Sequence, residues 1–274
     1  MTTKTAMTTE AYAKVNLTLE VFGVRGDGYH ALRSLVVPIS LSDTLDIAPS
    51  AALSSDTGYA DDLVLKAARA LDPSRGAEIR VTKRIPAGGG LGGGSADAAA
   101  TLVALNEFWN LGCSREELCE IGAQVGSDVP ALVLGGPVVM QGRGEVVERV
   151  VCPPLDFVVA NPGVHTSTRE VYARCTSRDL SAPSATEACL AALETGDLGR
   201  IAASFVNDLA LPACHLHPEI ADALASLRTA GVLGATVSGS GSSVFGLVES
   251  AARAGELAES LCKKGLSAWA VHTM

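Results

Sequence analysis

The feature that most constrains the fold is a dense run of glycine between a predicted strand and a predicted helix. Six of the seven residues from Gly88 to Gly94 are glycine. Residues 77–83 before the run alternate like a strand, and residues 95–105 after it strongly favour a helix. Glycine is entropically costly in a fold, so a run persists where the backbone must turn sharply or approach another group closely. A strand, a glycine loop and a helix N-terminus together predict an anion site for a phosphate.

Three alternative roles for the glycine run fit less well. The spacing Gly88-x-Gly90-x-x-Gly93 matches a dinucleotide-binding fingerprint, but that fingerprint needs an acidic residue at the end of a second strand about 20 positions later, and this region reads as helix. The Walker pattern needs Lys directly after its last glycine, and Gly94 is followed by Ser95. A flexible linker would be polar and would lack ordered segments on both sides. A phosphate loop of a different kind is the remaining interpretation.

Composition narrows the class of protein. A chain of 274 residues with 47% hydrophobic content can bury a sizeable core, as one large domain or two smaller ones. The net charge of −9 argues against a nucleic-acid or anionic-membrane surface. The N-terminal segment resembles no signal peptide, and the longest apolar stretch, 129–140, is too short to span a membrane. Seven scattered cysteines are typical of small buried apolar residues in a reducing cytosol, so we expect a cytoplasmic protein.

Hydrophobic periodicity predicts mixed strands and helices. Residues 11–22 alternate between an apolar and a polar face, which predicts one strand. A capping box at 114–117 begins a helix that ends near Val125, and Pro130 lies near the start of the next helix. Strands are expected at 35–40, 44–48, 155–160, 234–238, 243–248 and 268–272, a hairpin at 136–149, and helices at 61–71, 168–175, 185–195, 197–206, 217–230 and 250–264. This order favours an α+β protein in two halves that meet near residues 150–154.

Two charged residues are candidates for phosphoryl chemistry, which needs a phosphate cradle, charge neutralisation and a positioned hydroxyl. Lys14 is the only cation on the first predicted strand and lies two residues from Asn16. Taken alone, it could equally be a solvated lysine of an edge strand. Asp128 could act as a base, or it could be an ordinary helix N-cap.

Four segments resemble the motifs of the GHMP kinases, which include galactokinase and the homoserine, mevalonate and phosphomevalonate kinases. Ala11-Tyr-Ala-Lys-Val-Asn-Leu17 resembles Pro-Ala-Lys-Leu-Asn-Leu, with Ala-Tyr replacing the usual Ser/Ala-Pro. Pro86-Ala-Gly-Gly-Gly-Leu-Gly-Gly-Gly-Ser95 resembles Pro-x-x-x-Gly-Leu-Gly-Ser-Ser-Ala with one extra glycine. Gly126-Ser-Asp-Val-Pro130 and the Gly/Ser segment 234–245 resemble two further motifs. The resemblance spans the whole chain.

This resemblance implies a two-domain α+β GHMP kinase fold with the active site in the cleft between domains. It implies an ATP-binding domain over 1–150 and a C-terminal domain over 151–274 that contributes to substrate binding. Lys14 would neutralise phosphate charge, Asp128 would position the hydroxyl and take its proton, and the Gly/Ser segment 234–245 would pack against the glycine loop or shape the site floor. Mg²⁺ is expected with ATP; Ser95 could reach it, but no acidic ligand is assignable. The residues expected at the ATP site are Pro86, Ala87, Gly88, Gly89, Gly90, Leu91, Gly92, Gly93, Gly94, Ser95, Ala96, Lys83 and Asp62. Asp62 departs from the family, which usually has Asn there.

A short block, Arg25-Gly-Asp-Gly-Tyr-His30, resembles Arg-x-Asp-Gly-Tyr-His and points to one branch of the family. That branch uses ATP to phosphorylate the 2-hydroxyl of a cytidine diphosphate sugar alcohol on the non-mevalonate route to isoprenoid precursors. The resemblance implies that Tyr29 and His30 bind the cytosine end, that Tyr172 stacks on cytosine and that Asn16 also faces the substrate. Another GHMP small-molecule kinase and a non-catalytic GHMP-fold binding protein remain alternatives. We expect no nucleic-acid or membrane partner, and the oligomeric state stays open.

Overall fold

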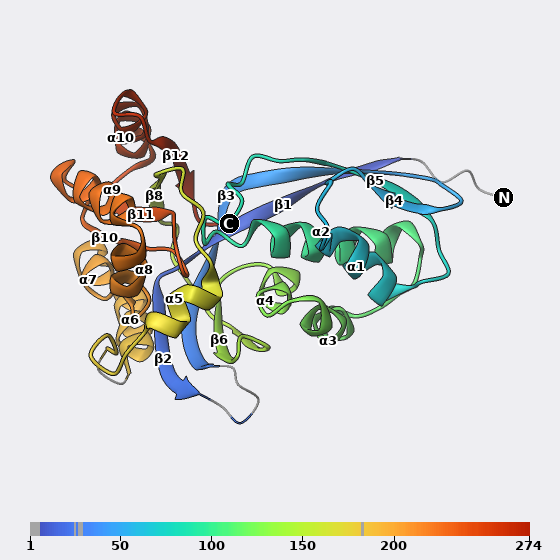
Figure 1. Ribbon diagram of the computed structural model, residues 1–274, viewed down its shortest axis with the longest axis horizontal. Coiled ribbons are helices and arrows are strands. Elements are labelled where there is room, and N and C mark those ends of the chain that lie inside the picture. Colours follow the sequence, from blue (N-terminus) through green and yellow to red (C-terminus); the bar gives the residue numbers. More distant parts are fainter. Residues whose placement is uncertain (1–5, 25, 27–29, 182–183) are drawn as a thin grey trace. The chain divides into compact units, whose positions relative to one another are not determined.

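The computed structural model describes residues 6–24, 26, 30–181 and 184–274 and divides into two compact units (Figure 1). Unit 1 comprises Met1–Ala13, Leu41–Ile85 and Gly92–Gly135, and unit 2 comprises Lys14–Ser40, Pro86–Leu91 and Gly136–Met274. Strands β1 (Met7–Asn16) and β3 (His30–Ala48) contribute residues to both. The N-terminal strands and the glycine run therefore each contain a boundary between the units. The expected division into domains 1–150 and 151–274 stays a prediction.

Unit 1 combines short strand pairings with a group of four helices. The second half of β3 pairs antiparallel with β5 (Ala77–Thr82), which pairs parallel with β4 (Leu53–Ser55). The helices are α1 (Leu63–Leu71), α2 (Gly93–Phe108), α3 (Arg115–Val125) and α4 (Val129–Leu134). They pack on one another around small and branched apolar side chains, including Ala98, Leu102 and Leu118. The Ala-rich composition of α2 suits this close packing, because alanine favours helix and takes little space.

Unit 2 contains the remaining strand pairings and a separate four-stranded sheet. The first half of β3 pairs antiparallel with β2 (Thr18–Val24) and β6 (Val138–Gly142). The separate sheet is antiparallel, in the order β10 (Gly234–Val237), β11 (Val244–Val248), β8 (Asp156–Asn161) and β12 (Ser267–His272). Helices α9 (Pro218–Thr229) and α10 (Ala251–Lys263) pack on it. The other elements of unit 2 are β7 (Val146–Arg149), α5 (Thr168–Arg174), α6 (Ala185–Thr195), α7 (Leu198–Ala203), β9 (Val206–Asn207) and α8 (Ala210–Leu216).

Most predicted elements are confirmed, and the differences have physical causes. The predicted strand over 11–22 is two strands, β1 and β2, broken at Leu17. Its expected polar face is also buried, at Lys14, Asn16, Thr18 and Glu20, because other elements supply hydrogen bonds to these side chains. The strands expected at 35–40 and 44–48 form one long strand, β3. The short elements β4, β9 and α8 were not predicted.

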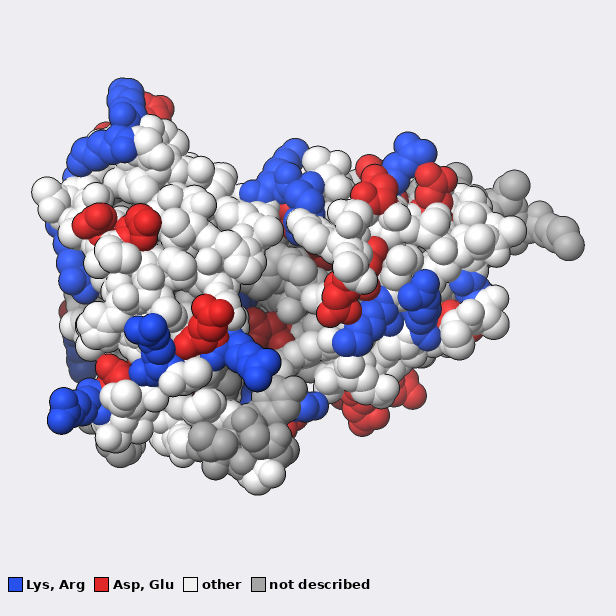
Figure 2. All heavy atoms as spheres, in the orientation of Figure 1, with Lys and Arg blue, Asp and Glu red and all other residues white. Residues whose placement is uncertain are grey.

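The described surface carries charges of both signs, and Figure 2 shows Lys and Arg interspersed with Asp and Glu on the visible face. None of the helices in the described parts of the chain is long and apolar enough to cross a membrane. All seven cysteines are free. Only Cys189 is buried and Cys262 is exposed, so the expectation that the cysteines are buried apolar residues holds for one of them.

Candidate active site

The buried cation of the first strand is held by two oxygens within unit 2. The Lys14 ammonium donates to Asn16 Oδ1 at 2.7 Å and to the carbonyl oxygen of Gly90 at 3.0 Å. Lys14 is 4% exposed, so the interpretation as a solvated edge lysine is wrong. Asn16 in turn donates from Nδ2 to Ser34 Oγ at 2.8 Å. Both polar ends of the Asn16 side chain are thus engaged, and Asn16 fixes the direction in which Lys14 points.

The first part of the glycine loop packs against the Gly/Ser turn that links β10 and β11. Ser238 Oγ donates to the Gly90 carbonyl oxygen at 3.0 Å, and the Ser243 amide donates to the Gly89 carbonyl oxygen at 2.9 Å. Gly90 has φ +73°, and a Cβ there would lie 2.0 Å from the Ser238 carbonyl oxygen. The expected packing of the Gly/Ser segment 234–245 against the glycine loop is confirmed. At least one glycine of the run, Gly90, is therefore required for close packing within the protein.

The last glycines of the run already belong to helix α2, which begins at Gly93 rather than at the predicted Ser95. The N-cap residue, Gly92, is left-handed at φ +71° and has no side chain to cap the first turn. The first amide groups of a helix have no partner inside it, so they are available to an anion. A Cβ at Gly93 would lie 2.9 Å from the Ile85 side chain, whereas Gly94 is exposed.

Asp128 occupies the N-cap position of the six-residue helix α4 in unit 1. Its side chain makes no capping hydrogen bond, and its backbone is helical at φ −84° and ψ −11°. Asp128 therefore lies at the N-cap position, but the interpretation as an ordinary capping residue is wrong because the side chain makes no hydrogen bond to the first turn of α4. The carboxylate is half-buried and is not engaged by the helix that it precedes. Lys14 belongs to unit 2, so the two candidate catalytic residues come from different units.

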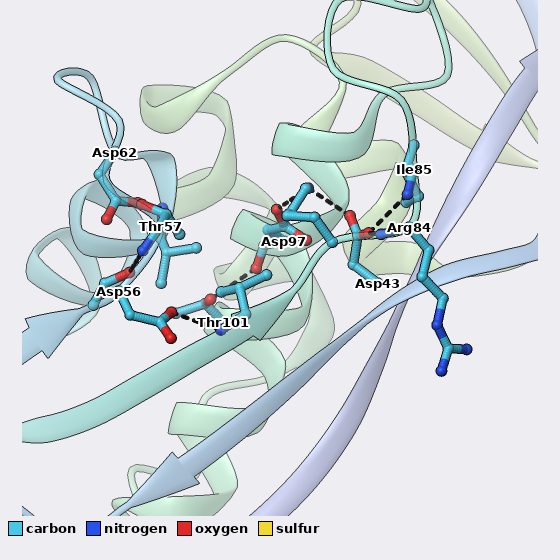
Figure 3. Close-up of polar contacts among 12 residues, drawn as sticks. Asp43, Asp56, Thr57, Asp62, Arg84, Ile85, Asp97 and Thr101 are labelled. Atoms are coloured by element: carbon cyan, nitrogen blue, oxygen red, sulfur yellow. Dashed lines mark hydrogen bonds and ion pairs between the residues drawn. The ribbon is translucent and has the colours of Figure 1, made fainter. Parts of the chain in front are cut away.

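Lys83 lies in a cluster of charges in unit 1 that the sequence did not reveal, together with Asp43 and Asp97, which Figure 3 labels. Its ammonium contacts Asp43 Oδ2 at 2.5 Å and Asp97 Oδ2 at 2.6 Å. Burial lowers the pKa of Lys83, but its hydrogen bonds to the two carboxylates outweigh burial, and the net shift is upward. Burial raises the pKa of Asp97 to about 7, against the lowering effect of Lys83. Lys83 was expected at the adenosine end of the ATP site, and that role stays a prediction.

The second residue expected near adenosine, Asp62, is the N-cap of α1. Its Oδ1 accepts from the amide nitrogens of Val64 at 2.9 Å and Leu65 at 3.4 Å. This capping contact gives a structural reason for an acidic residue where the family usually has Asn, since both side chains cap helices well. A contact with ATP stays a prediction.

Two of the residues expected to bind cytosine lie together in unit 2. The rings of His30, at the start of β3, and Tyr172, on α5, have centroids 5.0 Å apart and planes tilted by 31°. Both side chains are half-buried. A planar base could be recognised here by ring stacking and by the imidazole nitrogens. Tyr29 lies outside the described residues.

Comparison with known proteins places these features in one family. The model of the GHMP kinases N terminal domain matches residues 62–136, and that of the GHMP kinases C terminal matches residues 189–266. The 4-diphosphocytidyl-2-C-methyl-D-erythritol kinase of Pelotomaculum thermopropionicum is 45% identical over 88% of this chain and 88% of its own length. The enzyme of the same name from Symbiobacterium thermophilum is 40% identical over 98% of this chain and all of its own.

Solved structures agree. A crystal structure titled 4-(cytidine 5'-diphospho)-2C-methyl-D-erythritol kinase matches with a TM-score of 0.86 and 36% identity, covering 97% of this chain and 99% of its own. A homoserine kinase from Cytophaga hutchinsonii, 19% identical, shares the fold with a TM-score of 0.76, covering 100% of this chain and 96% of its own. With identity above 35% across nearly the full length of named relatives and both family domains present, the chain belongs to the 4-diphosphocytidyl-2-C-methyl-D-erythritol kinases of the GHMP kinase family.

Proposed function

We propose that this protein transfers the γ-phosphoryl group of ATP to the 2-hydroxyl of 4-diphosphocytidyl-2-C-methyl-D-erythritol, giving the 2-phosphate and ADP. The observation that carries the proposal is the full-length identity of 40–45% to enzymes of that name. The pairing of His30 with Tyr172 supports a substrate that carries a pyrimidine base. The reaction is a step of isoprenoid precursor synthesis, and the cytoplasm is the proposed compartment.

Each candidate residue has a role that its surroundings suit. The uncapped start of α2 and the loop from Pro86 to Gly92 would bind the phosphates of ATP. Lys14 would stabilise negative charge on the transferring phosphoryl group, and the oxygens of Asn16 and Gly90 fix its direction. Asp128 would orient the 2-hydroxyl and take its proton, a role for which its carboxylate is not diverted to helix capping.

Mg²⁺ would enter with the nucleotide, bound chiefly by phosphate oxygens. Among the described residues no group of three or more His, Cys, Asp or Glu side chains could hold a metal ion by itself. Ser95, half-buried on the first turn of α2, is the proposed protein ligand. When bound, the ion would neutralise phosphate charge.

A coupled assay of ADP release tests the proposal. The purified protein is given ATP and Mg²⁺ with the cytidyl substrate, with mevalonate or with homoserine. We expect turnover with the cytidyl substrate and at most background with the other two. Turnover with mevalonate or homoserine instead would favour another GHMP small-molecule kinase. ATP and substrate binding without turnover would favour a non-catalytic binding protein.

A further inference from the structure

The charge cluster of Asp43, Lys83 and Asp97 joins the two points between which the glycine loop runs. Lys83 lies just before the loop, after β5, and Asp97 lies on the second turn of α2, just after it. The loop residues between them, 86–91, belong to unit 2, so the chain leaves unit 1 after Ile85 and returns at Gly92. A contact between Lys83 and Asp97 therefore fixes the span that the loop must bridge.

Asp43 is the centre of this arrangement, and Figure 3 shows its carboxylate directed at the segment before the loop. Asp43 Oδ1 accepts from the backbone amides of Arg84, at 2.5 Å, and Ile85, at 2.8 Å. Its Oδ2 accepts from Lys83 Nζ at 2.5 Å. Asp43 is fully buried at 0% exposure, so these charge-assisted bonds act where water does not screen them.

The cluster also borders the first turn of α2. A Cβ added at Gly93 would lie 3.6 Å from Lys83 Nζ and 2.9 Å from Ile85. Asp97 is 4% exposed, and its Oδ1 is buried without a hydrogen-bond partner in the part of the chain that is described. A buried ion pair selected only for stability gains little over apolar packing, and one with an unsatisfied oxygen gains less. The free-energy cost of this buried ion pair is easier to understand if the pair serves to hold the loop and the start of α2 in one geometry.

We propose that Asp43, acting with Lys83 and Asp97, is a positioning residue for ATP: it sets where the glycine loop begins and where the first turn of α2 lies, without touching the nucleotide. The inference rests on the proposed ATP site at this loop. Its consequence is selective. Loss of the Asp43 charge should weaken ATP binding and leave binding of the cytidyl substrate unaffected, because Asp43 contacts the segment 83–85 before the loop, whereas His30 packs on Tyr172.

Asp43→Asn is the direct test, because the amide keeps the size and one acceptor oxygen but loses the charge that holds Lys83. Asp46→Asn is the matched control: Asp46 lies on the same strand, is exposed, and contacts Thr8 Oγ1 instead of the cluster. Titration calorimetry gives the Kd for ATP, and steady-state assays give KM for each substrate. We expect Asp43→Asn to raise the Kd and KM for ATP roughly tenfold, equivalent to about 1.4 kcal/mol. KM for the cytidyl substrate should stay within about twofold, and Asp46→Asn should match wild type.

Asp97→Asn keeps the test decisive if Asp43→Asn does not fold. It breaks the same bridge at its other end, and it should also raise the Kd for ATP. The double variant should lose less than the product of the single losses, because both residues act through Lys83. Unchanged ATP affinity in a folded Asp43→Asn or Asp97→Asn protein, with only a lower Tm, would overturn the inference. If wild type binds ATP but shows no turnover of the cytidyl substrate, the proposed function fails while the calorimetric comparison still decides the positioning role.

Discussion

Lys14 is buried with its ammonium directed at the Asn16 side chain and the backbone of Gly90. A charge in such a place is costly unless oxygens surround it. Two acceptors also leave an ammonium with a defined direction, which a surface lysine lacks. The residue thus has the properties needed to stabilise charge on a phosphoryl group.

Lys14→Met should lower turnover by on the order of 10²-fold, because electrostatic stabilisation of the transferring phosphoryl group is lost. It should also lower stability by about 1–3 kcal/mol, because Asn16 Oδ1 loses its buried donor. Turnover assays and denaturant unfolding measure both effects. Lys66→Met is the control, since Lys66 is exposed and its ammonium donates to the Val125 carbonyl oxygen. A folded Lys14→Met enzyme with normal turnover would remove Lys14 from the chemistry.

Asp97 makes stability depend on pH near neutrality. Burial raises its pKa to about 7 from the ordinary 3.8, with Lys83 and Asp43 as the charged groups facing it. The folded state therefore holds this proton at a pH where the unfolded chain has released it, so stability is lost as pH rises from about 4 to 7. Wild type should lose Tm relative to Asp97→Asn across that range. Parallel Tm curves for the two proteins would show that Asp97 titrates normally.

At the scale of elements, the glycine loop and the β10–β11 turn form one packed unit. The close approach at Gly90 is possible because Gly90 has no side chain: a Cβ there would meet backbone atoms of Ser238 and Gly241. The loop thus depends on a turn almost 150 residues later in the sequence.

Gly90→Ala should be strongly destabilising, by more than about 1 kcal/mol, because the residue is left-handed and a methyl group would overlap the Ser238 carbonyl. Gly94→Ala is the matched change in the same run. That position is exposed and helical, and a Cβ would meet only Leu63 Cδ1 at 3.3 Å. Denaturant unfolding should show Gly94→Ala within about 0.5 kcal/mol of wild type or slightly more stable. Equal effects of the two changes would contradict this view of the loop.

Helix α5 presents Tyr172 to His30 at the start of β3. Tyr172→Ala should raise KM for the cytidyl substrate about tenfold, since stacking on a base contributes roughly 1–3 kcal/mol. Tyr172→Phe keeps the ring and should remain close to wild type, and KM for ATP should not change in either variant. A similar loss in both variants would assign the effect to the hydroxyl instead of the ring.

At the scale of the whole molecule, the two proposed catalytic residues belong to separate compact units, Lys14 to unit 2 and Asp128 to unit 1. The sequence predicted most helices and strands, because their periodicity is local. It missed α8, which contains Pro212, and β9, which has two residues. It placed Glu20 on the polar face of a strand but did not predict its burial, because Glu20 accepts from the first amides of α6, a contact that no local pattern encodes.

Some residues of the candidate site were likewise predicted from the sequence, and others became evident only from the fold. Motifs pointed to Lys14, to the glycine loop, and to His30 and Tyr172, whose rings lie near each other in the fold. They could not identify Asp43, because an aspartate in Leu41-Ser-Asp-Thr-Leu45 has the pattern of an ordinary strand residue. Only the fold places it against Lys83, 40 positions away.

The central proposal is that the protein transfers a phosphoryl group from ATP to the 2-hydroxyl and that Asp128 assists this transfer. The most direct measurement is ³¹P NMR of the reaction of ATP with the cytidyl substrate, catalysed by wild type and by Asp128→Asn. Wild type should give ADP and one new phosphomonoester signal from the phosphorylated substrate. Asp128→Asn is nearly isosteric, so the variant should fold normally, and it should form that product roughly 10²–10⁴-fold more slowly. No phosphomonoester from wild type, or equal rates from the two proteins, would contradict this chemistry.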